Sequence, residues 1–297
     1  MKAALLPDRG VVKVAGDDAR RFLNGIVTID LDQLIPGGAR FAALLTPQGK
    51  IIADFIVTEA PVEDGGGFFL DCPRALSSNL AEKLSFYKLR SKVTIDDLSE
   101  RVGVIAIWEG DGGTSDAALV YPDPRLPTLG RRGILPLGLA GEASGDLGAR
   151  LVDATEYEAH RIALGVPRGG LDFMYNDAFP HETAMDQLHG VDFDKGCYIG
   201  QEVVSRMQHR GAARTRIVAV TYDGGAPEAG TPVTAGDKAV GTMGSARNGR
   251  GIAILRLDRL GDAHAAGTPL MAGGIALRAF RPEWADFAFP NDTAPVS

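Results

Sequence analysis

The chain has 297 residues, with 31 basic and 38 acidic side chains and a formal net charge of −7. Its 45% hydrophobic and 23% charged residues are typical of a folded globular protein and exclude bulk disorder. No apolar stretch approaches the roughly 18 residues of a membrane span, and the acidic balance argues against direct nucleic-acid binding. The start lacks the apolar run of about 7–15 residues that marks a secretory signal, so we expect a cytoplasmic protein with no membrane partner.

The N-terminal part of the sequence predicts strands that alternate with helices. A hairpin is the clearest element, because the turn Thr46-Pro47-Gln48-Gly49 separates two apolar runs. This mixture favours an α+β fold over a doubly wound parallel sheet. The expected elements are the strand Val11–Val14, the helix Ala19–Asn24 capped by Asp17 or Asp18, the hairpin strands Phe41–Leu45 and Ile51–Thr58, the strand Phe68–Asp71, a helix from Pro73 to about Leu84, and the strands Val93–Ile95 and Val102–Trp108.

The middle of the chain predicts a surface connection and then two helices. Residues 109–150 are rich in Gly, Pro and Asp, and we expect them to carry one strand, Ala117–Tyr121. The expected helices are one that starts at the capping box Thr155–Glu158 and ends at Gly165, and one from Ile199 to about Gln208.

From Arg216 onward the sequence consists of short apolar runs separated by glycine turns, which is typical of a small β-barrel or sandwich. The expected strands are Ile217–Tyr222, Pro232–Ala235, Val240–Ser245, Gly251–Leu257 and Ile275–Phe280. We therefore expect three parts: an N-terminal α+β subdomain (1–110), a middle subdomain (111–212) and a C-terminal β-barrel (213–297).

The segment Lys195–Glu202, with the sequence KGCYIGQE, has the strongest chemical character in the chain. Two glycines flank Cys197, which permits an unusual backbone shape. If a helix begins near Ile199, its N-terminus and Lys195 would favour the Cys197 thiolate. The alternative is a buried cysteine that packs as a small hydrophobe. The only other cysteine is Cys72, and two cysteines alone complete neither a zinc site nor an iron–sulfur cluster.

Two acidic residues are further candidates. Asp54 lies on an otherwise apolar strand, where alternation places it on one face with Ile52 and Ile56. A buried Asp54 would need a partner such as a ligand amine or backbone N–H groups, whereas a solvated edge-strand aspartate would not. Glu182, after Pro180-His181, could accept hydrogen bonds from a ring N–H and an adjacent amino group, or could cap a helix.

The motif Lys195–Glu202 resembles the signature of the YgfZ-type folate-binding proteins. These are paralogues of the glycine-cleavage T-protein and include a mitochondrial iron–sulfur assembly factor. The resemblance covers essentially the whole chain. Its supporting segments are Gly16–Asn24, the hairpin Thr46–Asp54, Arg161–Pro167, Pro180–Glu182, Val191–Phe193, Arg206 and Gly211.

The resemblance implies three subdomains around a central cavity that binds tetrahydrofolate, with a C-terminal β-barrel. It implies a role in the assembly or repair of 4Fe–4S proteins, with iron–sulfur carrier or client proteins as partners and an indirect link to tRNA modification. Cys197 would be the functional thiol, beside Lys195. The candidate folate contacts that it implies are Asp54, Glu182, Tyr198 and Arg206.

The sequence departs from the T-proteins in two ways. Their hairpin resembles G-x-I-I-D-D, whereas this chain has Ala53-Asp54, and they lack the cysteine motif. The leading hypothesis is therefore a folate-binding accessory factor for iron–sulfur proteins. The alternatives are a folate-dependent aminomethyltransferase, in which Asp54 positions or deprotonates the amine, and an interaction module that binds no folate.

Overall fold

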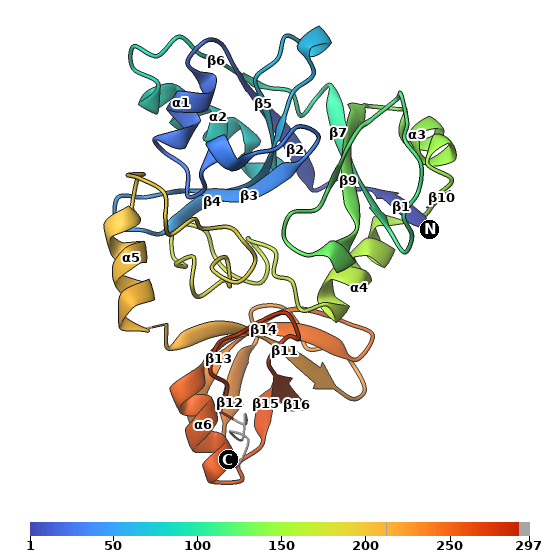
Figure 1. The fold of residues 1–297 in the computed structure, drawn as a ribbon. Coiled ribbons are helices and arrows are strands. Elements are labelled where there is room, and N and C mark those ends of the chain that lie inside the picture. The colour runs from blue at the N-terminus through green and yellow to red at the C-terminus, as the bar shows by residue number, and fades with distance from the viewer. Residues whose placement is uncertain (212, 291–297) are drawn as a thin grey trace, which may run out of the picture. The chain divides into compact units, whose positions relative to one another are not determined.

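The computed structural model describes residues 1–211 and 213–290. The fold is α+β, as predicted, and divides into two compact units (Figure 1). Unit 1 comprises Met1–Glu158 and Leu188–Gln201, and unit 2 comprises Ala159–Gln187 and the chain from Glu202 onward. The three-part division stays a prediction, and residues 212 and 291–297, which it includes, lie outside the described residues. No helix in the described ranges is long and apolar enough to cross a membrane.

The first sheet of unit 1 has the strand order β3-β4-β5-β2-β6. Helices α1 (Ala19–Asn24) and α2 (Ser77–Tyr87) share one hydrophobic core with one face of this sheet, through Phe22, Leu80 and Phe55 among others (Figure 1). The strands are β2 Arg9–Ala15, β3 Ala39–Leu45, β4 Ile51–Glu59, β5 Phe68–Pro73 and β6 Thr94–Asp97. Short 3-10 turns occupy Leu31–Gln33, Val62–Asp64, Arg74–Leu76 and, later in the chain, Pro127–Leu129.

The predicted hairpin is confirmed, with a β-bulge that the sequence pattern did not reveal. Strands β3 and β4 pair antiparallel, and their register shifts between Leu44 and Leu45. Because a bulge inserts an extra residue, the strict alternation predicted for Ile52 is wrong, and its side chain joins the core on the helix-covered face. Asp54 is buried on a strand that lies between β3 and β5, so the solvated edge-strand alternative is also wrong.

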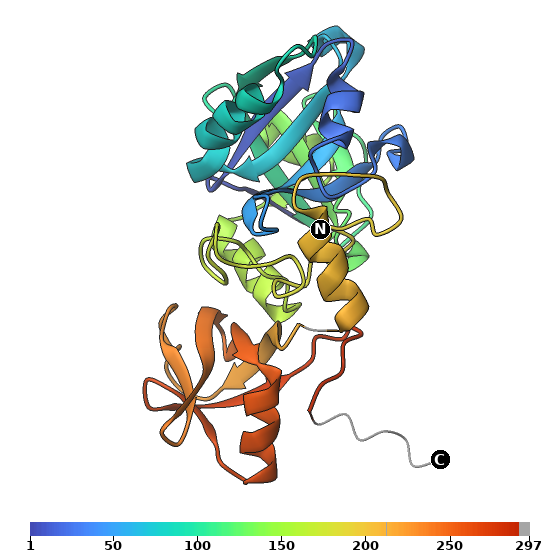
Figure 2. The ribbon, with the colours of Figure 1, turned by 90° about the vertical axis from the view of Figure 1, so that its left-hand side faces the viewer.

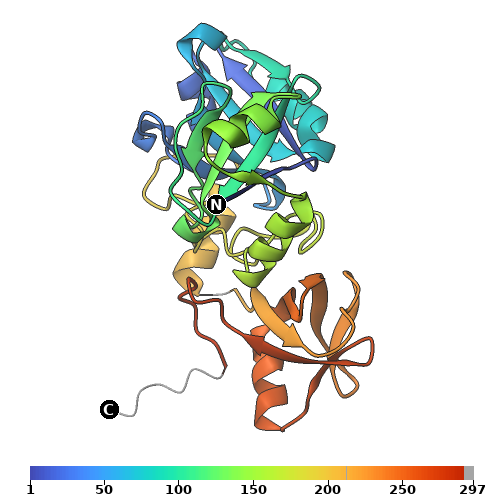
Figure 3. The same cartoon turned by 90° about the vertical axis from the view of Figure 1, so that its right-hand side faces the viewer.

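The second sheet of unit 1 corrects the expectation for residues 109–150. Its strand order is β10-β1-β7-β9-β8, and β9 forms its ladder between β7 and β8. The sequence concealed β9 because Arg132 occupies a buried position within it, which breaks the apolar pattern. Helix α3 packs on this sheet (Figure 3). The elements are β1 Lys2–Leu5, β7 Val102–Trp108, β8 Leu119–Pro122, β9 Arg131–Pro136, α3 Ala140–Asp146 and β10 Arg150–Leu151.

The predicted helix starts need correction. Asp18 occupies the N-cap position of α1, but its carboxylate accepts a hydrogen bond from the backbone N–H of Lys92 (2.7 Å) instead of capping the helix. Helix α4 (Ala154–Ala163) is capped by the Asp153 carboxylate, which accepts the Thr155 N–H at 2.9 Å. Pro73 ends β5, and α2 begins only after a 3-10 turn. For α1, a backbone group distant in sequence thus takes the carboxylate that the sequence predicted as the helix cap.

Unit 2 contains most of helix α5 (Gln201–Arg210) and a closed barrel with the order β11-β14-β13-β12-β15-β16. The predicted barrel is confirmed. Two elements were not predicted, β15 and helix α6 (Leu257–Ala265), which runs along the barrel (Figures 2 and 3). Gly261 weakens the helical signal of α6, but burial of Leu260 compensates. The strands are β11 Thr215–Tyr222, β12 Pro232–Ala235, β13 Lys238–Arg247, β14 Arg250–Arg256, β15 Leu270–Ala272 and β16 Ile275–Phe280.

Candidate functional site

The Cys197 thiol is exposed on a loop that belongs to unit 1. It lines a groove of about 610 Å³, which we call the Cys197 groove. Helix α5 begins at Gln201, so Cys197 precedes the helix by four residues and the predicted position at a helix N-terminus is wrong. The alternative of a buried, packed cysteine is also wrong. The other lining residues are Asp17, Arg20, Arg21, Asn24, Gly25, Asp30, Asp32, Lys195 and Gly196.

Lys195 anchors this loop to the chain that follows α1. Its ammonium donates hydrogen bonds to the backbone carbonyls of Asn24 (2.8 Å), Val27 (2.9 Å) and Ile29 (2.6 Å). Nζ also lies 5.4 Å from the ring centroid of Tyr198. Burial lowers the pKa of Lys195 from 10.5 to about 8. The structure thus gives Lys195 a positioning contact, and its predicted effect on the Cys197 thiol stays a prediction.

Gly200 provides the second attachment of the loop. Its φ of +81° lies in the left-handed region, and a Cβ there would come within 2.6 Å of the Thr46 carbonyl oxygen. The loop therefore lies directly against the turn of the β3–β4 hairpin, where only glycine fits. Tyr198 is buried between these two attachments, and burial raises its pKa to about 12.

The charge of Asp54 interacts with the guanidinium group of Arg9 and contributes to raising the pKa of that group. Burial lowers the pKa of Arg9. Among the interactions that raise this pKa, the one with the Asp71 carboxylate is the largest. The buried carboxylate of Asp54 therefore has a cationic neighbour within the protein.

Arg9 is the first residue of a buried ion-pair chain that sequence analysis missed. Arg9 Nε contacts Asp71 Oδ1 at 2.6 Å, and Arg132 bridges Asp71 Oδ2 (2.8 Å) to Asp123 Oδ2 (3.0 Å). Arg125 completes the chain at 2.7 Å from Asp123. Burial opposes ionisation of Asp123, but the two guanidinium groups still hold its pKa well below the usual range. The ion pairs join β5 of the first sheet to β9 of the second sheet. The sequence signal that could have revealed them was a charged residue within each of these apolar strands.

Glu182 and Arg206 belong to unit 2, whereas Asp54, Lys195, Cys197 and Tyr198 belong to unit 1. Glu182 Oε2 accepts the backbone N–H of Phe179 at 2.9 Å, a local contact that closes a turn. Arg206 is exposed on α5 and pairs with Glu202 one turn away. The predicted folate contacts of Glu182 and Arg206 stay predictions.

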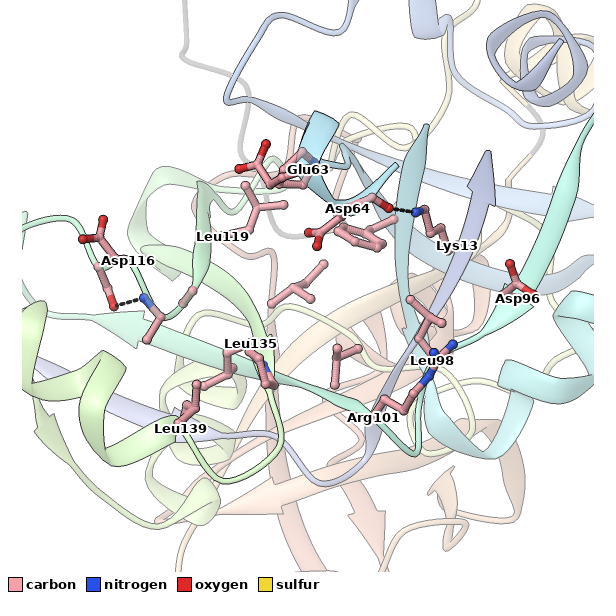
Figure 4. A pocket seen from close by; sticks show the side chains of 18 residues that line it. Lys13, Glu63, Asp64, Asp96, Leu98, Arg101, Asp116, Leu119, Leu135 and Leu139 are labelled. Atoms are coloured by element: carbon pink, nitrogen blue, oxygen red, sulfur yellow. Dashed lines mark hydrogen bonds between the residues drawn. The ribbon is translucent and has the colours of Figure 1, made fainter. Parts of the chain in front are cut away.

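A second, wider groove of about 830 Å³ in unit 1 shares no lining residue with the Cys197 groove (Figure 4). Its wall combines leucines such as Leu119 and Leu135 with charged residues, and Lys13 donates a hydrogen bond to the Asp64 carbonyl. Across residues 1–211 and 213–290, no group of three or more His, Cys, Asp or Glu side chains is arranged to hold a metal ion.

The fold is similar to that of the glycine cleavage system aminomethyltransferase T from Bartonella henselae. The TM-score is 0.73, with 16% identity, and the match covers 97% of this chain and 87% of that structure. The CAF17 C-terminal β-barrel domain model matches residues 214–287. The fold is thus that of an aminomethyltransferase-T-like protein with a CAF17-type barrel.

Curated relatives define the family further. The chain is 30% identical to the human mitochondrial iron–sulfur cluster assembly factor IBA57 over 309 residues, which cover 94% of this chain and 84% of the human protein. It is 36% identical to the mitochondrial IBA57 homologue of Mycosarcoma maydis over 236 residues, 74% of this chain. The chain spans only 57% of that protein and 54% of its Neurospora crassa counterpart. The chain therefore belongs to the IBA57/CAF17 family, as the resemblance to YgfZ-type proteins predicted.

These comparisons correct the expected location. The matching human, mouse and fungal proteins are named as mitochondrial, so the cytoplasmic prediction is wrong. The prediction failed because the absence of a secretory signal argues only against secretion, which is one of several routes to a compartment.

Proposed function

We propose that this protein is a tetrahydrofolate-binding factor for the assembly or repair of 4Fe–4S proteins, in which Cys197 acts as a metal-ligating thiol. The observation that carries the proposal is the exposed Cys197 thiol on a loop held in place by Lys195 and Gly200. The names of the relatives support the biological process. Through cluster-containing tRNA-modifying enzymes, such a factor would affect tRNA modification indirectly.

The number of available ligands determines what Cys197 can do. Iron–sulfur clusters are usually held by four thiolates, and a cysteine binds iron as the thiolate. Cys72 is fully buried, and burial raises its pKa to about 12, so it is not available as a ligand. Cys197 would therefore supply one ligand to a cluster whose remaining ligands come from a carrier or client protein. The cluster is cargo in this scheme, passed between proteins.

The experiment compares the two cysteines in cells that lack the chain. Cys197→Ala should leave the activity of a 4Fe–4S enzyme at the level of the deletion strain, whereas Cys72→Ala should restore it at equal protein abundance. An enzyme without a cluster, assayed in the same extracts, controls for general effects. Normal 4Fe–4S enzyme activity with Cys197→Ala would remove the thiol from the mechanism.

The folate part of the proposal rests on the two acidic side chains. Glu182 accepts a hydrogen bond from the backbone N–H of Phe179, and its carboxylate is the group that we expect to contact a pterin N–H group. Asp54 is buried on an apolar strand, and we propose that its carboxylate contacts the folate in addition to interacting with Arg9. Bound folate would supply a carrier for a one-carbon unit, and the residues of this chain would orient its pterin ring.

Anaerobic calorimetry with tetrahydrofolate tests this part. We expect micromolar binding, about −8 kcal/mol, weakened at least about tenfold by Asp54→Asn or Glu182→Gln. Glu228→Gln is the matched control, because Glu228 is an exposed acid between β11 and β12 that is not a candidate folate contact. If the well-folded wild type does not bind tetrahydrofolate, Asp54 and Glu182 have structural roles only.

A further inference from the structure

A basic and apolar surface lies at the end of α2 and in the loop that follows it. Phe86 is 76% exposed and Leu89 is 87% exposed. The segment 83–92 carries four basic residues and no acidic one, in a chain whose net charge is −7. We call this surface the α2 tip and define it by Lys83, Phe86, Leu89, Arg90 and Lys92.

The backbone of the α2 tip is strained at Leu89, whose side chain is exposed. Leu89 has φ = +45°, in the left-handed region that is unfavourable by about 1–2 kcal/mol for residues with a Cβ. The turn is braced, because the Ser91 N–H donates to the Lys88 carbonyl (2.7 Å) and the Lys88 ammonium donates to the Val93 carbonyl (3.2 Å). A strained residue held by such contacts, with an exposed apolar side chain, is typical of a binding surface.

The cationic groups of the α2 tip are available to a partner. In the described part of the chain, no carboxylate lies within ion-pair distance of Arg21, Lys83, Arg90 or Lys92. Elsewhere in unit 1, arginines of similar exposure are paired, as Arg20 is with Glu59 and Arg74 with Glu100. Unpaired cations on an acidic protein create a local positive field.

The α2 tip is continuous with the Cys197 groove. A third groove, of about 800 Å³, is lined by Asp18, by Arg21 and Phe22 of α1, and by Leu89, Arg90 and Ser91. Arg21 also lines the Cys197 groove. Arg21 is therefore the residue through which a partner on the α2 tip would reach the Cys197 groove.

We propose that the α2 tip is the docking surface for an acidic partner protein, which places its cluster site over Cys197. Apolar side chains of the partner would cover Phe86 and Leu89, and its carboxylates would pair with Arg21 and Arg90. This inference rests on the proposed function, because it specifies the partner of the Cys197 groove.

The chemistry of the surface favours an acidic protein over other occupants. Phe86 at the end of α2 and Leu89 in the braced turn are exposed apolar side chains of the kind that contact a protein partner. A partner for this surface must supply both carboxylates and apolar side chains, which an acidic protein surface does and a nucleic-acid backbone does not.

The test measures binding between the full chain and a purified acidic iron–sulfur carrier protein loaded with a [2Fe–2S] cluster, under anaerobic conditions. Leu89→Asp should weaken Kd at least about tenfold, while Val62→Asp should not, because Val62 is equally exposed (88%) but lies in a 3-10 turn away from α2. Arg21→Glu combined with Arg90→Glu should abolish the decrease in affinity between low and high salt. The exposed Arg101→Glu is the matched charge control.

A further variant separates docking from folding. Leu89→Gly removes the apolar side chain and also relieves the positive φ, so it should reduce binding without lowering the thermal unfolding temperature. Equal affinity of Leu89→Asp and wild type, or no carrier binding by wild type, would overturn the proposal. So would Leu89-dependent binding of the wild type to phosphatidylglycerol vesicles or RNA, or a Leu89-dependent dimer, in place of carrier binding.

The activity of a 4Fe–4S enzyme in complemented cells distinguishes failure of the docking proposal from failure of the proposed function. If Leu89→Asp retains wild-type binding and activity while Cys197→Ala loses activity, the function stands and the docking surface is wrong. If Leu89→Asp loses carrier binding while neither variant affects activity, the surface stands and the proposed function is wrong.

Discussion

At the scale of single residues, Lys195 shows how the motif is built. Its ammonium satisfies three carbonyls of the chain after α1, which lie more than 160 residues earlier in the sequence. We expect Lys195→Met to lower the free energy of unfolding by about 1–3 kcal/mol, because the carbonyls lose their donor in a partly buried place. Urea denaturation measures the effect, and the exposed Lys83→Met is the matched control.

The pKa of Lys195 gives this prediction a pH dependence. Burial lowers the pKa from 10.5 to about 8 in the folded protein, so between these values the native state binds fewer protons than the unfolded state. The stability of wild type should therefore rise from pH 8 to pH 10.5 relative to Lys195→Met. A constant difference between the two proteins over this range would show that Lys195 titrates as an exposed lysine does.

At the scale of elements, the hairpin and the motif loop form one structural piece. Gly200 lies against the hairpin turn in a left-handed conformation, whereas Gly196, in the same motif, has no positive φ and has open space within 4 Å of where a Cβ would lie. Gly200→Ala should destabilise the protein by about 2 kcal/mol or more, through backbone strain and the contact with Thr46. Gly196→Ala should change stability by less than about 0.5 kcal/mol.

Chemical denaturation of both glycine variants checks this expectation. Similar midpoints for Gly200→Ala and Gly196→Ala would mean that the loop can leave the hairpin without cost. The comparison also bears on the proposed function, because a loop displaced by Gly200→Ala would carry Cys197 with it.

The helices and strands also show which parts of the fold the sequence could predict and which it could not. Apolar runs bounded by turn residues located the hairpin and most barrel strands. Strand β9 was hidden by Arg132, whose burial depends on Asp71 and Asp123 in other parts of the chain. For the site, the motif located Cys197, but the contacts of Lys195 depend on a tertiary fold that no local pattern encodes.

At the scale of the whole molecule, each unit has its own hydrophobic core and one of the two tryptophans of the chain. In unit 1, Trp108 is buried edge-to-face against Tyr157, with ring centroids 5.3 Å apart. In unit 2, the indole N–H of Trp284 donates to the Leu164 carbonyl at 2.7 Å. Tryptophan fluorescence in Trp284→Phe and Trp108→Phe backgrounds can therefore follow the two units separately.

Arg132→Met tests whether the two units unfold independently or as one cooperative unit. The substitution leaves two buried carboxylates of unit 1 with one guanidinium group fewer, and breaking a buried ion pair costs about 3–5 kcal/mol. With a urea slope of about 1–3 kcal/mol/M, the transition reported by Trp108 should move to lower urea by about 1 M or more, while that of Trp284 stays in place. If both transitions move together, the two cores unfold as one, and the ion-pair chain stabilises the whole molecule, including the barrel.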